Sequence, residues 1–204
     1  LEITSEDGTV QREERELQIL ARNEWVLDDG YEELIASYVQ PNHPETKEIL
    51  KVASKILEQR TGTSSIEGYQ SGPERAIQIA QAVFEALQAK DIAYINPPAS
   101  FSVRQKLRPL DEVLDSGTGT CIDLACAYAA CLEQAGLRPL IWLVPGHAFA
   151  GFLTEEGTLD SSVEKDINTF VNLTDSGLAQ AVEAVCLTNG MSYESAVSAT
   201  RVHL

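Results

Sequence analysis

The sequence predicts an α+β fold in which helices come first and a small antiparallel sheet then packs on one buried helix. Three observations lead to this prediction. Segments that begin at Pro44 and Pro73 carry apolar residues at helical spacing. Residues 121–135 are apolar nearly all round, as in a helix that is buried on most sides. Two strand-like segments follow at once, at 139–144 and 147–153.

The N-terminal part, residues 1–91, is predicted to be a mainly helical portion packed on the core. Residues 10–40 have the pattern of two helical pieces, broken at Asp28-Asp29-Gly30. The helix from Pro44 reaches about Gln59 before Gly62, and His43 or Asn42 lies near its cap. We therefore expect His43 to have a structural role.

Residues 92–204 are predicted to form the core, and the two parts to make one compact unit. Pro145-Gly146 joins the two strands of a hairpin, and Gly136 ends the buried helix. The other expected elements are a short strand and Pro-Pro corner in 92–104, a short helix at 109–114, a short helix near 166–173, a third strand at 179–187 and a closing helix at 192–202.

The composition fits a globular chain with a core of its own. Of 204 residues, 44% are hydrophobic, and 15 basic against 31 acidic residues give a net charge of −16. Such a surface repels phosphates, so we expect no direct nucleic-acid binding by this domain. The sequence has no apolar run long enough for a bilayer and no visible signal peptide, which predicts no membrane partner. We interpret the chain as a domain of a longer cytoplasmic protein.

The four cysteines argue against a zinc or disulfide framework. Cys121, Cys126 and Cys131 recur every five residues on one predicted helix, where each step turns roughly 140°. They therefore do not share a face, and Cys186 lies far along the chain. We expect Cys126 and Cys131 to be small, reduced core residues, and we expect no metal and no cofactor.

Cys121 has the position expected of a reactive thiol. Thr120 is a good N-cap and Asp123 follows as a relative of the capping box, which makes Cys121 the first residue of the buried helix. Unpaired N–H groups and the helix dipole at that point favour thiolate over thiol. The same N–H groups could stabilise an oxyanion on an attacked carbonyl. The alternative is a buried structural cysteine.

His147 is the histidine best placed to act as a base for that thiol. It follows Gly146 and opens the second strand of the hairpin, so both groups lie at the ends of rigid elements. The other two histidines are His43 and His203. A histidine with a purely structural role in the turn is the alternative.

The third member of a triad and a second oxyanion donor are less sharply defined. Glu183 is the one charge in the apolar run Ala181–Val185, and a buried charge needs a partner such as an imidazole. Asp160 is the alternative acid, and both could be structural. Gln105 carries a side-chain amide suited to an oxyanion, although a solvent-exposed glutamine fits equally well.

Three short motifs make the sequence resemble the transglutaminase-like (papain-like) cysteine hydrolases. They are Gly119-Thr120-Cys121-Ile122-Asp123, Gly146-His147-Ala148-Phe149 and Val182-Glu183-Ala184-Val185. In that superfamily they correspond to the nucleophile at the start of the central helix, the histidine at the start of a strand and the acid in the next strand. Phe149 replaces the commoner Trp, Glu183 replaces Asp, and a long insertion separates the second motif from the third.

Further segments resemble a transglutaminase-like module of large bacterial proteins that also carry a helicase-type P-loop ATPase region. The segments are Tyr38-Val39-x-Pro41-Asn42-His43-Pro44, Gly68-Tyr69-Gln70-Ser71, Pro97-Pro98-Ala99-Ser100-Phe101, Gln105-x-Leu107-Arg108 and Leu132–Leu137. The resemblance implies covalently linked partner domains, and it suggests Gln105 as the oxyanion glutamine. This chain has no G-x-x-x-x-G-K-[ST] motif, so we assign it no ATPase activity.

The first functional hypothesis is a cysteine hydrolase or acyltransferase that acts on an amide of a peptide or protein. Cys121 would attack the carbonyl, His147 would move the proton, Glu183 would orient His147, and Gln105 would help to hold the oxyanion. A second hypothesis is a non-catalytic binding or regulatory module of the helicase-related parent. A third is a purely structural domain, because one fold hosts enzymes and inert relatives alike.

Overall fold

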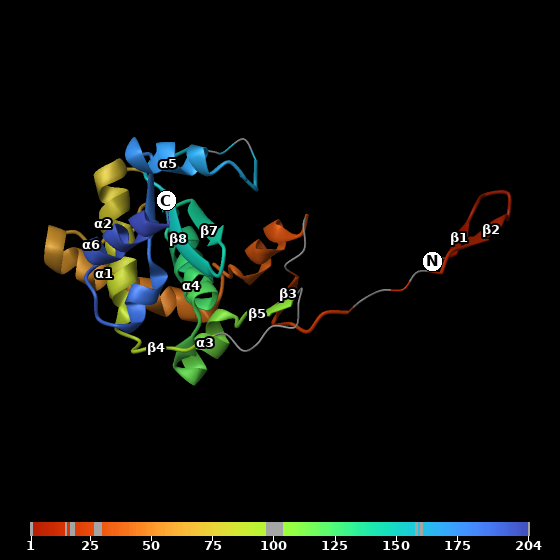
Figure 1. Ribbon diagram of the computed structural model, residues 1–204, viewed down its shortest axis with the longest axis horizontal. Coiled ribbons are helices and arrows are strands. Elements are labelled where there is room, and N and C mark those ends of the chain that lie inside the picture. The colour runs from red at the N-terminus through yellow and green to blue at the C-terminus, as the bar shows by residue number, and fades with distance from the viewer. Residues whose placement is uncertain are drawn as a thin grey trace.

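The protein has mixed α and β structure with small sheets, as expected for the α+β class. The computed structural model describes residues 2–14, 16, 19–26, 30–96, 104–157, 159 and 161–203. In Figure 1 the larger helices gather around a short three-stranded sheet, and the N-terminal hairpin stands apart at one end of the long axis.

The N-terminal segment differs from the expected pair of helices. Its described part holds strands β1 (Glu2–Thr4), β2 (Val10–Arg12) and β3 (Glu24–Val26), followed by the 3₁₀ helix η1 (Glu32–Tyr38). The prediction of a first helical piece in 10–40 is therefore wrong, and the second piece is a 3₁₀ helix. Trp25 explains the change, because it is buried on a strand that pairs with β5 (Arg104–Lys106), a tertiary contact that local periodicity does not encode. Asp28 and Asp29 lie outside the described residues.

The two proline-initiated helices are confirmed as α1 (Pro44–Thr61) and α2 (Pro73–Gln88). His43 caps α1, since its Nδ1 accepts a hydrogen bond from the Glu45 N–H at 3.2 Å, which confirms the structural role expected of it. Gly62 closes the helix in the left-handed conformation.

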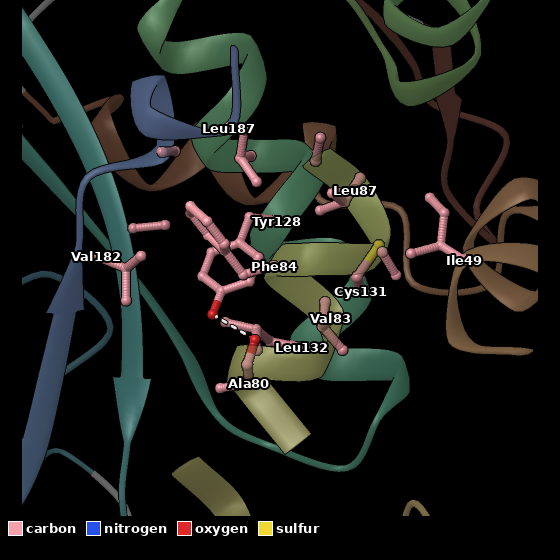
Figure 2. Close-up of a cluster of buried hydrophobic side chains, with 14 of the residues drawn as sticks. Ile49, Ala80, Val83, Phe84, Leu87, Tyr128, Cys131, Leu132, Val182 and Leu187 are labelled. Atoms are coloured by element: carbon pink, nitrogen blue, oxygen red, sulfur yellow. Dashed lines mark hydrogen bonds between the residues drawn. The ribbon is translucent and has the colours of Figure 1, made fainter. Parts of the chain in front are cut away.

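Helix α4 (Cys121–Gln134) is the central element, as expected. Every residue from Cys121 to Leu132 is buried, because α1, α2 and the sheet all pack against it. Figure 2 shows Tyr128 of α4 beside Phe84 and Ala80 of α2, and the Tyr128 hydroxyl donates a hydrogen bond to the Ala80 carbonyl at 2.9 Å. The Tyr128 ring can therefore be fully buried, because its hydroxyl group has a hydrogen-bond partner.

The sheet on α4 is antiparallel in the order β7 (Pro139–Val144), β8 (His147–Leu153) and β9 (Ala179–Val182). The predicted hairpin is confirmed, with Val144 opposite His147 and a Pro145-Gly146 turn whose glycine has a φ of 76°. Gly151 is required in β8, because a Cβ there would lie 2.1 Å from the Gln180 carbonyl oxygen.

Smaller elements connect the N-terminal half to the core. Strand β4 (Ala93–Tyr94) pairs in parallel with β6 (Thr118–Gly119), and α3 (Leu110–Ser116) confirms the short helix expected at 109–114. The expected Pro97-Pro98 corner lies outside the described residues.

The C-terminal part keeps the expected order of elements with one correction. Helices α5 (Ile167–Asp175) and α6 (Tyr193–Ala199) match the expected helices, and a 3₁₀ turn η3 (Thr200–Val202) follows α6. The third strand was expected over 179–187, but β9 ends at Val182, and the 3₁₀ helix η2 (Ala184–Thr188) follows. The Glu183 side chain causes this early end, because it accepts a hydrogen bond from the Val185 N–H and caps η2.

One hydrophobic cluster joins the two halves of the chain. It contains Ile49 of α1 and Ile79 of α2 together with Leu124 of α4 and Phe152 of β8. A second cluster on the other face of the sheet holds Trp142 and Phe149 against Phe170 of α5. The layers are therefore α5, the β7–β9 sheet, α4 and the α1–α2 pair. Within the described ranges, no helix combines the length and apolar character needed to cross a membrane.

Candidate active site

Cys121 is the first residue of α4, as the sequence predicts. The capping box is complete: the Thr120 hydroxyl accepts from the Asp123 N–H at 3.4 Å, and Asp123 Oδ2 accepts from the Thr120 N–H at 3.0 Å. The cap fixes where the helix starts, and so it fixes the direction in which Cys121 leaves the backbone.

Asp123 also anchors the segment that precedes the helix. Its buried carboxylate accepts the Arg108 N–H at 2.7 Å and pairs with the Arg108 guanidinium at 3.0 Å. Asp123 is 1% exposed, so these bonds satisfy a charge that would otherwise be costly to bury. Asp123 is thus a structural clamp between Arg108 and the start of α4.

The surroundings of the Cys121 sulfur do not favour the thiolate, which corrects the expectation drawn from the helix start. Burial raises the pKa of the Cys121 thiol above its ordinary value. Hydrogen bonds from the backbone N–H groups of Ala148 and Ile122 act in the opposite direction, and the carboxylates of Glu183 and Asp123 raise the pKa further. The four cysteines are free and buried.

His147 and Glu183 are paired directly. The His147 Nε2 atom lies 2.7 Å from Glu183 Oε2, and the two side chains are 21% and 10% exposed. The other carboxylate oxygen, Oε1, accepts from the Val185 N–H at 3.1 Å, which holds the carboxylate in place. A neutral imidazole that donates from Nε2 to Glu183 keeps Nδ1 as its acceptor.

Cys121 lies next to the start of β8, the strand that carries His147. One of the backbone N–H groups that lower the pKa of the Cys121 thiol belongs to Ala148, the residue immediately after His147. Cys121 and Ala148 also share one buried cluster with Ile122. Three segments that are distant in sequence therefore converge: the start of α4, the start of β8 and the end of β9. Asp160, the alternative acid, lies outside the described residues.

Gln105 lies on β5, opposite Trp25 of β3. Leu107, two residues further along this extended segment, is buried in the cluster that contains Cys121. Because side chains two residues apart in an extended chain point to the same side, Gln105 faces the same side as Leu107. In the described part of the chain, no hydrogen bond engages the Gln105 amide.

Two residues at this site were missed by sequence reasoning. The His203 ring lies 4.9 Å from the His147 ring between centroids, and it also stacks on Phe149 at 5.8 Å. Burial raises the pKa of the Tyr94 hydroxyl, and the adjacent Cys121 and Glu183 raise it further. Because the chain has only three histidines, His203 could have been considered as a site residue from the sequence. Nothing in the sequence connects Tyr94 with Cys121.

A cavity of about 950 Å³ follows the outer edge of β7, between η1 and α5. All six residues of β7 line it, together with the acidic side chains of Glu32, Glu33, Glu133 and Glu164 and the basic side chains of Arg138 and Lys165. Ile35 and Ile141 belong both to its wall and to the cluster around Cys121. The cavity and the Cys121 cluster therefore share part of one wall, although Cys121, His147 and Glu183 do not themselves line the cavity.

Comparison with known proteins adds no relative. No protein-family model matches the sequence, and neither a curated protein nor a solved structure matches it.

Proposed function

We propose that the protein is a transglutaminase-like cysteine hydrolase or acyltransferase with Cys121 as nucleophile, His147 as base and Glu183 as orienting acid. The observation that carries the proposal is the 2.7 Å pairing of His147 with Glu183, next to Ala148, which shares a buried cluster with Cys121. A nucleophile, a base and a group that fixes the base are the minimal set for this chemistry.

The raised pKa of Cys121 determines how attack begins. A neutral thiol is a poor nucleophile, so His147 Nδ1 removes its proton as the sulfur bonds to the carbonyl carbon. The carbonyl oxygen becomes an oxyanion, which the N–H groups at the start of α4 and the Gln105 amide stabilise. Glu183 keeps the imidazole oriented and stabilises the positive charge that it acquires.

The intermediate collapses when the carbon–nitrogen bond breaks and the amine leaves with the proton from His147. A thioester on Cys121 remains. Water or a second amine then attacks the thioester carbon and gives its proton to His147, and the proton finally returns to the departing sulfur of Cys121. Water yields hydrolysis, whereas an amine yields transamidation.

An extended peptide with basic side chains is the substrate that the cavity along β7 supports. Residues flanking a two-residue turn exchange hydrogen bonds, so Val144 and Trp142 bond to β8, whereas Ile141 and Leu143 direct their N–H and C=O groups to the open edge. A peptide can pair with such an edge as an additional strand. Four acidic side chains against two basic ones line the cavity, and this excess together with the charge of −16 favours Lys and Arg in that peptide.

A non-catalytic binding module is the second candidate, and one observation favours it. Cys121 is 9% exposed, and its pKa is raised rather than lowered. As a binding module, the protein would hold a peptide in the cavity along β7 without turnover. The peptide would belong to a partner or to a linked domain of a helicase-related, cytoplasmic parent.

Acylation of the chain by p-nitrophenyl acetate tests the mechanism without knowledge of the natural substrate. We expect a burst of nitrophenolate that equals the enzyme concentration and an acetyl group on Cys121, located by mass spectrometry. His147→Ala should slow the burst by about 10²- to 10⁴-fold, the range of a general base. His43→Asn is the matched control, because asparagine preserves the cap of α1.

The proposal fails if Cys121 reacts no faster than a free thiol or if His147→Ala leaves the burst unchanged. Tight binding of a basic peptide combined with that result would establish the binding module instead.

A further inference from the structure

We infer that His147, Glu183 and His203 form a Zn²⁺ site at the centre of the candidate active site, and that the metal switches the thiol–imidazole pair off. The zinc site stands on the geometry of these three residues, whereas its inhibitory effect rests on the function proposed above. We expected no metal from the sequence, because the spacing of the four cysteines does not suit a zinc site. The three residues proposed here include no cysteine.

Three ligand atoms from distant segments meet here. His147 begins β8, Glu183 follows β9 as the cap of η2, and His203 follows the η3 turn after α6. Each offers one ligand atom, and these atoms all lie within 4.8 Å of one another. Within the described residues, this is the one group of three or more His, Cys, Asp or Glu side chains close enough to hold an ion.

The distances require a small opening of the His147–Glu183 pair and a small approach by His203. Two ligands about 2.0 to 2.1 Å from a tetrahedral zinc ion lie roughly 3.3 Å apart. His147 Nε2 and Glu183 Oε2 are hydrogen-bonded at 2.7 Å and must separate by about 0.6 Å to admit the ion between them. His203 is exposed and lies beyond a short 3₁₀ turn, so it can approach by the remaining distance of about 1.5 Å.

The donor set selects zinc over the abundant hard cations. Two imidazoles and one carboxylate suit Zn²⁺, whereas Mg²⁺ and Ca²⁺ prefer oxygen ligands throughout. The Val185 N–H holds the other oxygen of Glu183, which is the kind of outer contact that orients a ligating carboxylate. Three protein ligands leave a fourth position for water.

Bound zinc would block the proposed chemistry directly. A zinc ion on His147 occupies a nitrogen lone pair and separates the imidazole from Glu183. His147 then cannot take the proton from Cys121 while held by its orienting acid. Zinc release would restore the pair, so the site is a reversible switch.

Calorimetric titration of the full chain with ZnCl₂ at pH 7.5 tests the site itself. We expect one ion per chain, and a loss of affinity of at least about 100-fold in His203→Ala, since even outer-shell partners contribute 10- to 100-fold. Binding should weaken at pH 5.5 because protonated imidazoles cannot ligate. Cys121→Ala and the control His43→Asn should bind zinc as the parent chain does.

Full-strength binding in His203→Ala would overturn the inference, and so would binding that disappears in Cys121→Ala. The p-nitrophenyl acetate burst, measured with and without one equivalent of ZnCl₂, then tests the switch. Zinc should abolish the burst of the parent chain but not that of His203→Ala. If the parent chain gives no burst even without zinc, the proposed function fails, while calorimetry still decides the metal site.

Discussion

Replacement of Asp123 by Asn tests whether the clamp at the start of α4 is required for stability. The carboxylate is 1% exposed and accepts three hydrogen bonds: Oδ2 from the Thr120 N–H and the Arg108 guanidinium, and Oδ1 from the Arg108 N–H. An asparagine can keep one of these oxygens. Its NH₂ group replaces the other oxygen and then faces an N–H donor, so that two donors meet without an acceptor.

The cost follows from this mismatch. Each buried polar group without a partner costs about 1–3 kcal/mol, and the substitution leaves the Arg108 N–H and the new NH₂ group unmatched. Breaking a buried ion pair costs about 3–5 kcal/mol in comparable cases. We therefore expect Asp123→Asn to lower the free energy of unfolding by about 3–5 kcal/mol, which is a large share of the stability of a typical domain.

Urea unfolding followed by the fluorescence of Trp25 and Trp142 measures this difference. Asp166→Asn is the matched control, because Asp166 caps α5 at an exposed position where asparagine is an equally good cap. The control should change the free energy of unfolding by less than about 0.5 kcal/mol. A loss below about 1 kcal/mol in Asp123→Asn would refute the assigned role of the clamp.

Two further predictions concern the core. Gly151→Ala should destabilise the protein by at least about 3 kcal/mol or prevent its folding, since the new Cβ would meet the Gln180 carbonyl at 2.1 Å, whereas Gly157→Ala should be tolerated because nothing lies within 4 Å. Thermal unfolding of soluble protein distinguishes the two. Burial raises the pKa of Cys131 to about 12, and it also raises the pKa of Cys126 well above its ordinary value. Their unfolded forms ionise above about pH 8.5, so stability present below that pH should fall by about 1.4 kcal/mol per pH unit for each thiol. Urea unfolding at pH 8 and pH 10 measures the slope, which should be smaller in Cys126→Ala/Cys131→Ala; a flat profile for the parent chain would contradict the reasoning.

Elements specified by local signals could be predicted from the sequence, often to the residue. The proline starts of α1 and α2, the Thr120 cap of α4 and the Pro145-Gly146 hairpin were all found in this way. Each depends on side chains that act on neighbouring backbone. Elements that depend on remote contacts were not found, and the pairing of β3 with β5 is the main example.

The pairing of two candidate site residues could be predicted from the sequence, but the pKa direction of the candidate nucleophile could not. Cys121, His147 and Glu183 were named from their positions in the pattern, and the pairing of His147 with Glu183 agrees with the expected partnership. The direction of the Cys121 pKa was wrong, because helix position reveals the dipole but not the depth of burial. His203 was missed because its approach to His147 depends on how the last helix docks.

The buried, protonated state of Cys121 has a consequence for the durability of the protein. Oxidants and electrophiles attack thiolates far faster than thiols. The thiol form of Cys121 is therefore shielded from peroxide and from mixed disulfides, and in the mechanism proposed above it would lose its proton only when a substrate and His147 are aligned. Long shelf life in air without a reductant is the practical outcome that this arrangement leads us to expect.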